Sequence, residues 1–132
     1  MKRIKTIALL VLIGLFLLPS WSFADGDSDG NKLLSDCGQL IMLLDGQSVD
    51  QSGSEGIAFC LGLLQGLLHM NQLYEHHLKG AALFCSPTGT TTGQAARIVV
   101  KYLRDHPEEL HKRNSVLAFI ALRNAFPCTN KK

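Results

Sequence analysis

The fold depends most on the segment Ser54–Met70, SEGIAFCLGLLQGLLHM. At helical pitch its apolar side chains cover one broad arc, formed by Ile57, Cys60, Leu61, Leu63, Leu64, Leu67 and Leu68, with Phe59 and Met70 at the edges. An apolar face of this width is typical of a buried, central helix. Ser52 and Glu55 have the spacing of a capping box, which predicts where the helix begins. We expect it to run to His77 or Leu78, with Gly80 as its C-terminal stop.

The opposite side of this helix carries a row of very small residues at four-residue spacing, namely Ala58, Gly62 and Gly66. A glycine in a helix interior costs about 1 kcal/mol relative to alanine. This cost suggests that another helix crosses closely at the row. The crossing helix belongs either to the same domain or to a second copy in a homodimer. We favour the contact within the domain, because it needs no partner.

The first 24 residues have the pattern of a secretory signal peptide. Lys2, Arg3 and Lys5 are followed by an apolar core, 6–18, and by the small-x-small site Ser22-Phe23-Ala24. The core is too short for a comfortable membrane span. The sequence therefore predicts an exported chain with one mature domain, residues 25–132, and no membrane segment after cleavage.

The mature part is almost neutral. Ten of the thirteen basic residues and all eleven acidic residues lie after Ala24, which gives a charge of −1 with histidines neutral. This charge does not indicate nucleic-acid or membrane binding. Four cysteines remain, Cys37, Cys60, Cys85 and Cys128, and an even number in an exported chain indicates two disulfides.

The remaining chain predicts three further helices, over 31–44, from a Thr91–Gln94 capping box to about 105, and from Pro107 to about Ala125. The polar segments 45–54 and 86–91 read as loops. The first two helices would form an antiparallel hairpin in which Cys37 faces Cys60. A second hairpin would return Cys128 to Cys85. We therefore predict an all-α domain of about four helices in two hairpins, stapled by these two disulfides.

No catalytic or metal-binding pattern is evident. His69 and His76 lie two helical turns apart, and no HxxxH or HExxH is present. All four cysteines are assigned to disulfides, so no thiol remains for nucleophilic catalysis. Neighbouring Glu108 and Glu109 are explained by the positive end of a helix. We expect no enzyme activity, no metal and no cofactor. Arg97, Lys101 and Arg104 form a basic stripe that is either a solvated face or a contact for an acidic partner, and the solvated face is favoured.

Several segments together resemble a known family. The chain contains GIAFCLGLLQG (56–66), FCSPTGTTTGQ (84–94), VVKYLRDHPEELH (99–111) and AFPC (125–128) in this order. This pattern resembles the Rap/Tai family of immunity proteins, which protect bacteria from cell-wall amidase effectors delivered by type VI secretion systems. The resemblance extends from about Gly30 to Cys128.

The resemblance implies a periplasmic, helical, disulfide-containing protein that binds the papain-like Cys-His cleft of an amidase effector and occludes it. It also implies a homodimer, with Ala58, Gly62 and Gly66 as the packing row. The residues that contact the effector cannot be transferred one by one, so we predict them from exposed loops. The predicted partner-binding residues are Ser86, Pro87, Thr88, Gly89 and Thr90, with Asp45, Gln47 and Asp50 second.

The main alternative is a periplasmic stress protein with chaperone-like binding. It would bind many unfolded clients, increasingly at low pH as histidines and carboxylates protonate. An immunity protein would instead have one tight, stoichiometric partner.

Overall fold

The computed structural model describes residues 29–77 and 82–128, and the regular secondary structure within these ranges is helical. An isolated bridge between Asp29 and Arg113 is the only β-type pairing there. The elements are α2 (Gly30–Leu44), α3 (Gly53–His76), α4 (Thr92–Asp105), the 3-10 turn η1 (Pro107–Glu109) and α5 (Asn114–Ala125). The predicted all-α fold is confirmed. The predicted signal peptide and Gly80 lie outside the described residues.

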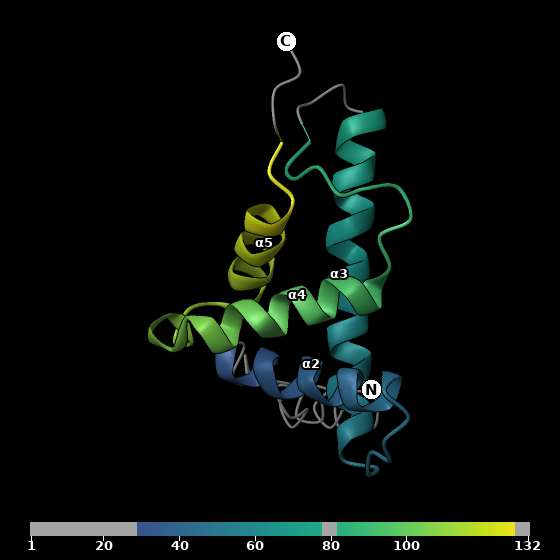
Figure 1. Cartoon of the computed structure of the whole chain (residues 1–132), viewed down its shortest axis with the longest axis vertical. Helices are drawn as coiled ribbons and strands as arrows, with labels where there is room; N and C mark the ends of the chain where they lie inside the picture. Colours follow the sequence, from purple (N-terminus) through teal and green to yellow (C-terminus); the bar gives the residue numbers. More distant parts are fainter. Residues whose placement is uncertain (1–28, 78–81, 129–132) are drawn as a thin grey trace, which may run out of the picture.

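The four helices pack as two consecutive pairs, α2 with α3 and α4 with α5, but the helices of each pair cross and are not antiparallel as the sequence predicted. Figure 1 shows α2 and α4 side by side and antiparallel, both crossing the lower half of the long α3. Helix α5 turns upward from the end of α4 and runs beside the upper part of α3. Both predicted disulfides are present, Cys37–Cys60 between α2 and α3, and Cys85–Cys128 near the C-terminal end.

The core lies where α2, α3 and α4 meet and continues toward α5. Each helix contributes a strip of apolar side chains, and Phe84 enters from the connection after α3. Phe84 is 1% exposed, and its ring meets that of Phe119 edge to face, with 6.4 Å between centroids. The other large, fully buried apolar side chains are Leu33, Leu40, Leu64, Leu103, Leu117, Leu122 and Val99.

The start of α2 explains why the last predicted helix is interrupted. Asp29 caps α2 by accepting a hydrogen bond from the Lys32 amide. The Gly30 amide donates to the carbonyls of Leu110 and Lys112, at 2.8 and 3.1 Å. These two carbonyls are engaged by α2 and follow the η1 turn, so α5 begins only at Asn114. The predicted continuous helix from Pro107 to Ala125 is wrong in this part.

Two predictions about α3 also need correction. Ser52 makes no side-chain cap, and its hydroxyl donates instead to Asp50, whose carboxylate accepts from the Gly53 amide. The predicted capping box with Glu55 is therefore absent. Gly62 and Gly66 are exposed, and a Cβ at either would have no neighbour within 4 Å. The favoured contact within the domain is wrong, because no described element crosses α3 at these glycines.

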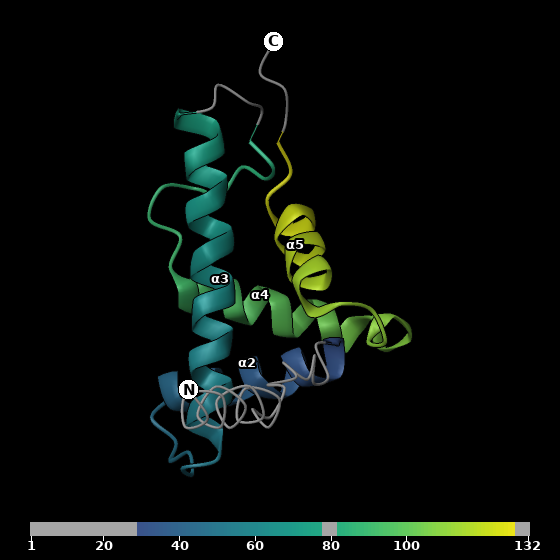
Figure 2. The ribbon, with the colours of Figure 1, turned by 180° about the vertical axis from the view of Figure 1, so that it is seen from behind.

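The buried strip of α3 is consequently narrower than the sequence pattern predicts. Ile57, Cys60, Leu64 and Leu68 are buried, whereas Leu61, Leu63 and Leu67 are only partly covered. Seen from behind in Figure 2, α3 lies in front of α4, and no other described helix covers it. None of the helices in the described ranges has the length and apolarity to cross a bilayer.

Candidate functional site

The predicted partner-binding loop after Cys85 is a well-defined turn. The amide and the hydroxyl of Thr90 both donate to the Pro87 carbonyl, at 3.1 and 2.7 Å. Gly89 has a φ of +86°, a conformation that a side chain at this position would strain. This geometry is that of a type II β-turn with glycine in its third place. The turn Pro87–Thr90 is therefore ordered by its own hydrogen bonds.

The exit of the turn is fixed by the start of α4. The Thr91 hydroxyl accepts from the Gln94 amide at 3.2 Å, and the Gln94 side chain accepts from the Thr91 amide at 3.1 Å. These reciprocal bonds are the capping box that the sequence predicted. Because α4 packs on α2, α3 and α5, the exit of the turn is held by the body of the protein.

The entry to the turn is held by three further contacts. Asn71 on α3 is 2% exposed, and its side chain accepts from the amides of Leu83 and Phe84 and donates to the Phe84 carbonyl. The Cys85 amide donates to the Phe126 carbonyl at 2.8 Å, beside the Cys85–Cys128 disulfide. The turn thus protrudes from a base that is anchored in the core and covalently closed.

The second predicted loop, 45–52, is joined to α4 by one ion pair. A guanidinium nitrogen of Arg97 lies 2.5 Å from a carboxylate oxygen of Asp45, although the two residues are 52 positions apart. The hydrogen bond from Arg97 lowers the pKa of the Asp45 carboxyl, and the same bond raises the pKa of Arg97. The other ion pairs in the described ranges connect residues three or four positions apart. Asp45–Arg97 is therefore the one that bridges distant segments there.

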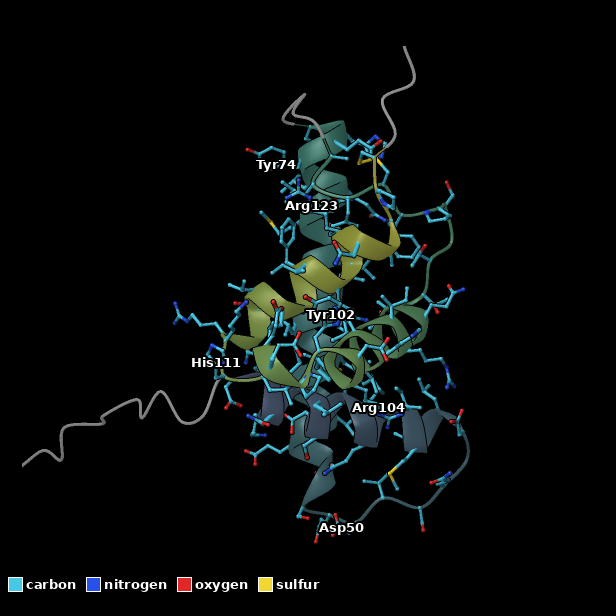
Figure 3. All side chains as sticks on the ribbon, turned by 60° about the vertical axis from the view of Figure 1, so that its left-hand side comes forward. Asp50, Tyr74, Tyr102, Arg104, His111 and Arg123 are labelled. Carbon is cyan, nitrogen blue, oxygen red and sulfur yellow. A yellow bond between two sulfur atoms is a disulfide. The ribbon has the colours of Figure 1, made fainter. Side chains whose placement is uncertain are left out.

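The predicted residues do not all share one surface. Asp45 lies beside α4 through Arg97, and Arg97 lines the same recess as the turn Pro87–Thr90. Figure 3 shows Asp50 at the lower end of the molecule, at the start of α3, far from that turn. Gln47, which lies between Asp45 and Asp50 in the sequence, is exposed, and its backbone amide donates to the Met42 carbonyl. Asp45 is thus connected to the recess beside the turn only through Arg97, and Asp50 lies apart from both.

A recess of about 420 Å³ opens behind the turn. Its walls are the turn Pro87–Thr90, the side chains Gln94, Arg97 and Ile98 of α4, and Phe126. Ile98 and Phe126 pack partly against the core, so they supply an apolar floor, while the α4 polar groups lie at the rim. Leu43 and Leu44 at the end of α2 are about half exposed, and Leu44 lies against Gly93 at the start of α4.

The basic stripe predicted on α4 is divided by these contacts. Arg97 pairs with Asp45, and Lys101 pairs with Asp105 at 2.5 Å. Arg104 is exposed on the same face of α4 as Arg97, two turns further along, and forms no ion pair within the described ranges. The stripe is thus not a continuous patch of free positive charge.

The described ranges contain no cluster of three or more His, Cys, Asp or Glu side chains that could hold a metal ion. His69, His76 and His77 are exposed near the end of α3. His106 stacks on Tyr102, with 4.2 Å between ring centroids, and its ring nitrogen lies 2.9 Å from the Tyr102 carbonyl. These histidines are accounted for by exposure or by local packing.

Arg97 and Asn71 are two residues of this site that the sequence interpretation did not single out as such, and the recess adds Ile98 and Phe126. Arg97 was placed in a solvated stripe, since nothing local indicates a partner 52 residues away. Asn71 follows the apolar run on the core-facing side of α3. A polar residue at such a position indicates a buried hydrogen-bonding partner, and this was the available signal.

The fold and site define a small helical domain, cross-linked by two disulfides, that presents a rigid turn beside a recess. The description "Rap1a immunity proteins" matches residues 29–128, which covers the whole described part of the chain. The chain therefore belongs to the Rap1a family of immunity proteins. No curated protein and no solved structure matches it.

Proposed function

We propose that this immunity protein acts in the periplasm on a peptidoglycan amidase effector delivered by a type VI secretion system, and that it is not itself an enzyme. Family membership supports an immunity role and hence a cognate effector. The amidase target and the export by residues 1–24 rest on the sequence resemblance and the leader pattern. Two disulfides are consistent with an oxidising compartment.

The anchored turn Pro87–Thr90 is the observation that supports occlusion of an enzyme cleft. A segment that enters a cleft loses little conformational entropy when it is already ordered, so more of the contact energy remains as affinity. Four features order this turn: its own hydrogen bonds, the Thr91–Gln94 box, the Asn71 contacts and the Cys85–Cys128 bridge. The turn is mostly exposed at its tip, with Thr88 and Gly89 open to solvent.

The test uses the protein exported from its full chain and purified in oxidised form. It is titrated against the type VI amidase candidates of the source bacterium, with calorimetry for binding and release of peptidoglycan fragments for activity. We expect one candidate to bind at an equal molar ratio and to lose its activity. Thr88→Arg should weaken that inhibition at least tenfold, because an added large cation at the tip cannot enter the same cleft.

The matched control is Ser115→Arg, a similar change at an exposed position of α5. If Thr88→Arg inhibits as well as wild type, occlusion by this turn is wrong. If the protein binds none of the amidases but holds many unfolded proteins increasingly at acid pH, the chaperone-like alternative replaces the amidase proposal.

We also propose that the exposed face of α3 forms a homodimer. Phe59, Met70 and Leu73 are 43%, 52% and 43% exposed on this helix, and Gly62 and Gly66 lie among them without neighbours. Ala58 is exposed as well. Each glycine lowers the stability of the helix by about 1 kcal/mol, and no contact in the described chain offsets this cost. Close packing of a second α3 against the glycines would offset it.

Sedimentation equilibrium tests the dimer. Wild type should have twice the monomer mass at micromolar concentration, and Gly66→Gln should be a folded monomer. Gly38→Gln is the matched control, because Gly38 of α2 also has no neighbour within 4 Å of its Cβ position. A wild-type protein that stays monomeric at high concentration would exclude this interface.

A further inference from the structure

The recess behind the turn Pro87–Thr90 has the composition of a side-chain receptor. Its floor contains the apolar Ile98 and Phe126, and its rim carries Arg97 and Gln94. The recess is open to solvent, and its volume of about 420 Å³ is ample for one large side chain. Apolar floors with a few polar groups at the rim fix both affinity and orientation.

Arg97 supplies the charge that selects what enters. A guanidinium carries five N–H donors in a fixed fork. In the described part of the chain its hydrogen bonds go to Asp45 alone, at 2.5 Å from one nitrogen and 3.5 Å from the other. The side chain remains 51% exposed, so donors are left for a further acceptor at the recess. Among the groups of a protein partner, a carboxylate is the acceptor that forms strong, charge-assisted hydrogen bonds with a guanidinium.

Exposed leucines at the end of α2 extend the surface of the recess on one side. Leu43 and Leu44 are exposed on the α2 side of Arg97, and Leu44 contacts Gly93 at the base of the turn. Exposed apolar side chains around a central arginine are the composition found at the energetic centres of protein interfaces. The ion pair with Asp45 keeps Arg97 in place between the two apolar parts.

We propose that the recess binds an apolar side chain of the effector that stands next to a carboxylate, with Arg97 as the residue that recognises the carboxylate. The complex then has two contacts. The turn enters the cleft of the effector, and a segment of the effector enters the recess behind the turn. This assignment rests on the proposed function for the identity of the partner. The chemistry of the recess itself does not depend on that identity.

Small probes test the recess without any effector. The exported, oxidised protein is labelled with ¹⁵N and titrated with N-acetyl-L-leucine, which combines an isobutyl side chain with a carboxylate. We expect shifts at Thr88, Gly89, Thr90 and the Arg97 side chain, with a dissociation constant in the low millimolar range. N-acetyl-L-leucinamide lacks the carboxylate and N-acetylglycine lacks the side chain, so both should bind at least tenfold more weakly.

Variants distinguish two roles of Arg97, recognition of the carboxylate and support of the loops through its ion pair with Asp45. Arg97→Gln should weaken N-acetyl-L-leucine binding at least tenfold, whereas Arg104→Gln, two turns further along α4 and outside the recess, should leave it unchanged. Asp45→Asn removes the ion pair but keeps the guanidinium, and it should preserve or strengthen binding. If Asp45→Asn weakens binding as much as Arg97→Gln, Arg97 only supports the loops and the assignment fails.

The remaining outcomes also decide the proposal. No shift up to the solubility limit, or shifts scattered over other surfaces, would overturn it. Equal binding of the acid and the amide would exclude recognition by Arg97. Against a binding amidase, Arg97→Gln should lower affinity roughly ten- to a hundredfold. If no amidase binds at all, the proposed function fails, while the probe titration still decides the recess.

Discussion

The side-chain amide of Asn71 donates to the carbonyl of Phe84 at 2.8 Å and accepts from the amide of the same residue at 3.1 Å. This pairing resembles one rung of a β-ladder, made by a side chain instead of a second strand. It allows an irregular segment to enter the core without leaving its backbone groups unpaired. Phe84, the residue before Cys85, is thereby buried. The hydrogen bonds to Asn71 fix the position of the base of the turn along α3.

Removing the Asn71 side chain should destabilise the protein strongly. Asn71→Ala leaves the amides of Leu83 and Phe84 and the Phe84 carbonyl without this partner. We expect a loss of roughly 2–4 kcal/mol in the free energy of unfolding, measured by urea denaturation. The exposed neighbour is the control: Gln72→Ala should change stability by less than about 0.5 kcal/mol. Equal effects at the two positions would contradict the role assigned to Asn71.

Two glycines of α3 should respond to alanine with opposite signs. At Gly56 a Cβ would lie 2.4 Å from a carboxylate oxygen of Asp36 and 3.3 Å from the Asp36 Cα, where α2 and α3 cross. Gly56→Ala should cost roughly 1–3 kcal/mol through overpacking. Gly66 has open space at the same atom, so Gly66→Ala should stabilise the dilute, monomeric protein by up to about 1 kcal/mol. Thermal unfolding at low concentration measures both, and the same sign for both would contradict this packing.

The two disulfides should be reduced in a fixed order. Cys37 and Cys60 are 0% exposed, whereas Cys85 and Cys128 are exposed. A thiol reductant must reach a sulfur atom to attack it, so a graded addition of dithiothreitol should open Cys85–Cys128 first. Alkylation of the new thiols followed by peptide mass spectrometry identifies the bond. Each bond is expected to contribute about 3–4 kcal/mol by the loop-entropy model. Simultaneous reduction of both bonds would show that unfolding, not access, limits the reaction.

Acid should weaken the contact between α4 and η1. Hydrogen bonds from Lys112 and Tyr102, the latter at 2.7 Å, lower the pKa of Glu109 below its ordinary 4.5. The folded protein then binds fewer protons than the unfolded chain near this pH. The stabilisation is therefore fully present above about pH 4.5 and is lost as the pH falls through the lowered pKa.

The measurement is the urea midpoint from about pH 6 to about pH 3. Glu109→Gln should lower the midpoint at neutral pH and reduce its further fall in acid. A variant that keeps the full wild-type slope in acid would show that Glu109 does not carry this effect.

At the alkaline end, burial and the bond to Glu109 raise the pKa of Tyr102 to about 12, and ultraviolet titration should detect its late ionisation.

Much of the fold follows from local sequence chemistry. Apolar spacing predicts the four helices, and the Thr91–Gln94 box gives the start of α4 correctly because both partners lie within one turn. The disulfide pairing was also predictable, because Cys37 and Cys60 lie on helices that follow one another in the sequence, although α2 crosses α3 and is not antiparallel to it. The turn at Gly89 was visible as a polar loop between two helices.

The errors arise where a long-range contact changes a local preference. Pro107 and the two glutamates favour a helix start, but the carbonyls of Leu110 and Lys112 bond to Gly30, about eighty residues earlier. Ser52 matches a cap pattern, yet its hydroxyl bonds to Asp50. Gly62 and Gly66 suggest a crossing helix, but the described chain leaves that side of α3 open.

The sequence by itself determined the number of helices, the presence of two cross-links and the family, because apolar spacing, cysteine number and motifs are read from the chain without its tertiary contacts. The composite surface was decided only by tertiary structure. Asp45 and Arg97 meet because α2 and α4 pack antiparallel, and the recess exists because Phe126 returns beside the turn through the Cys85–Cys128 bridge. No local pattern contains the relative placement of these helices, since it results from how their apolar strips fill one core.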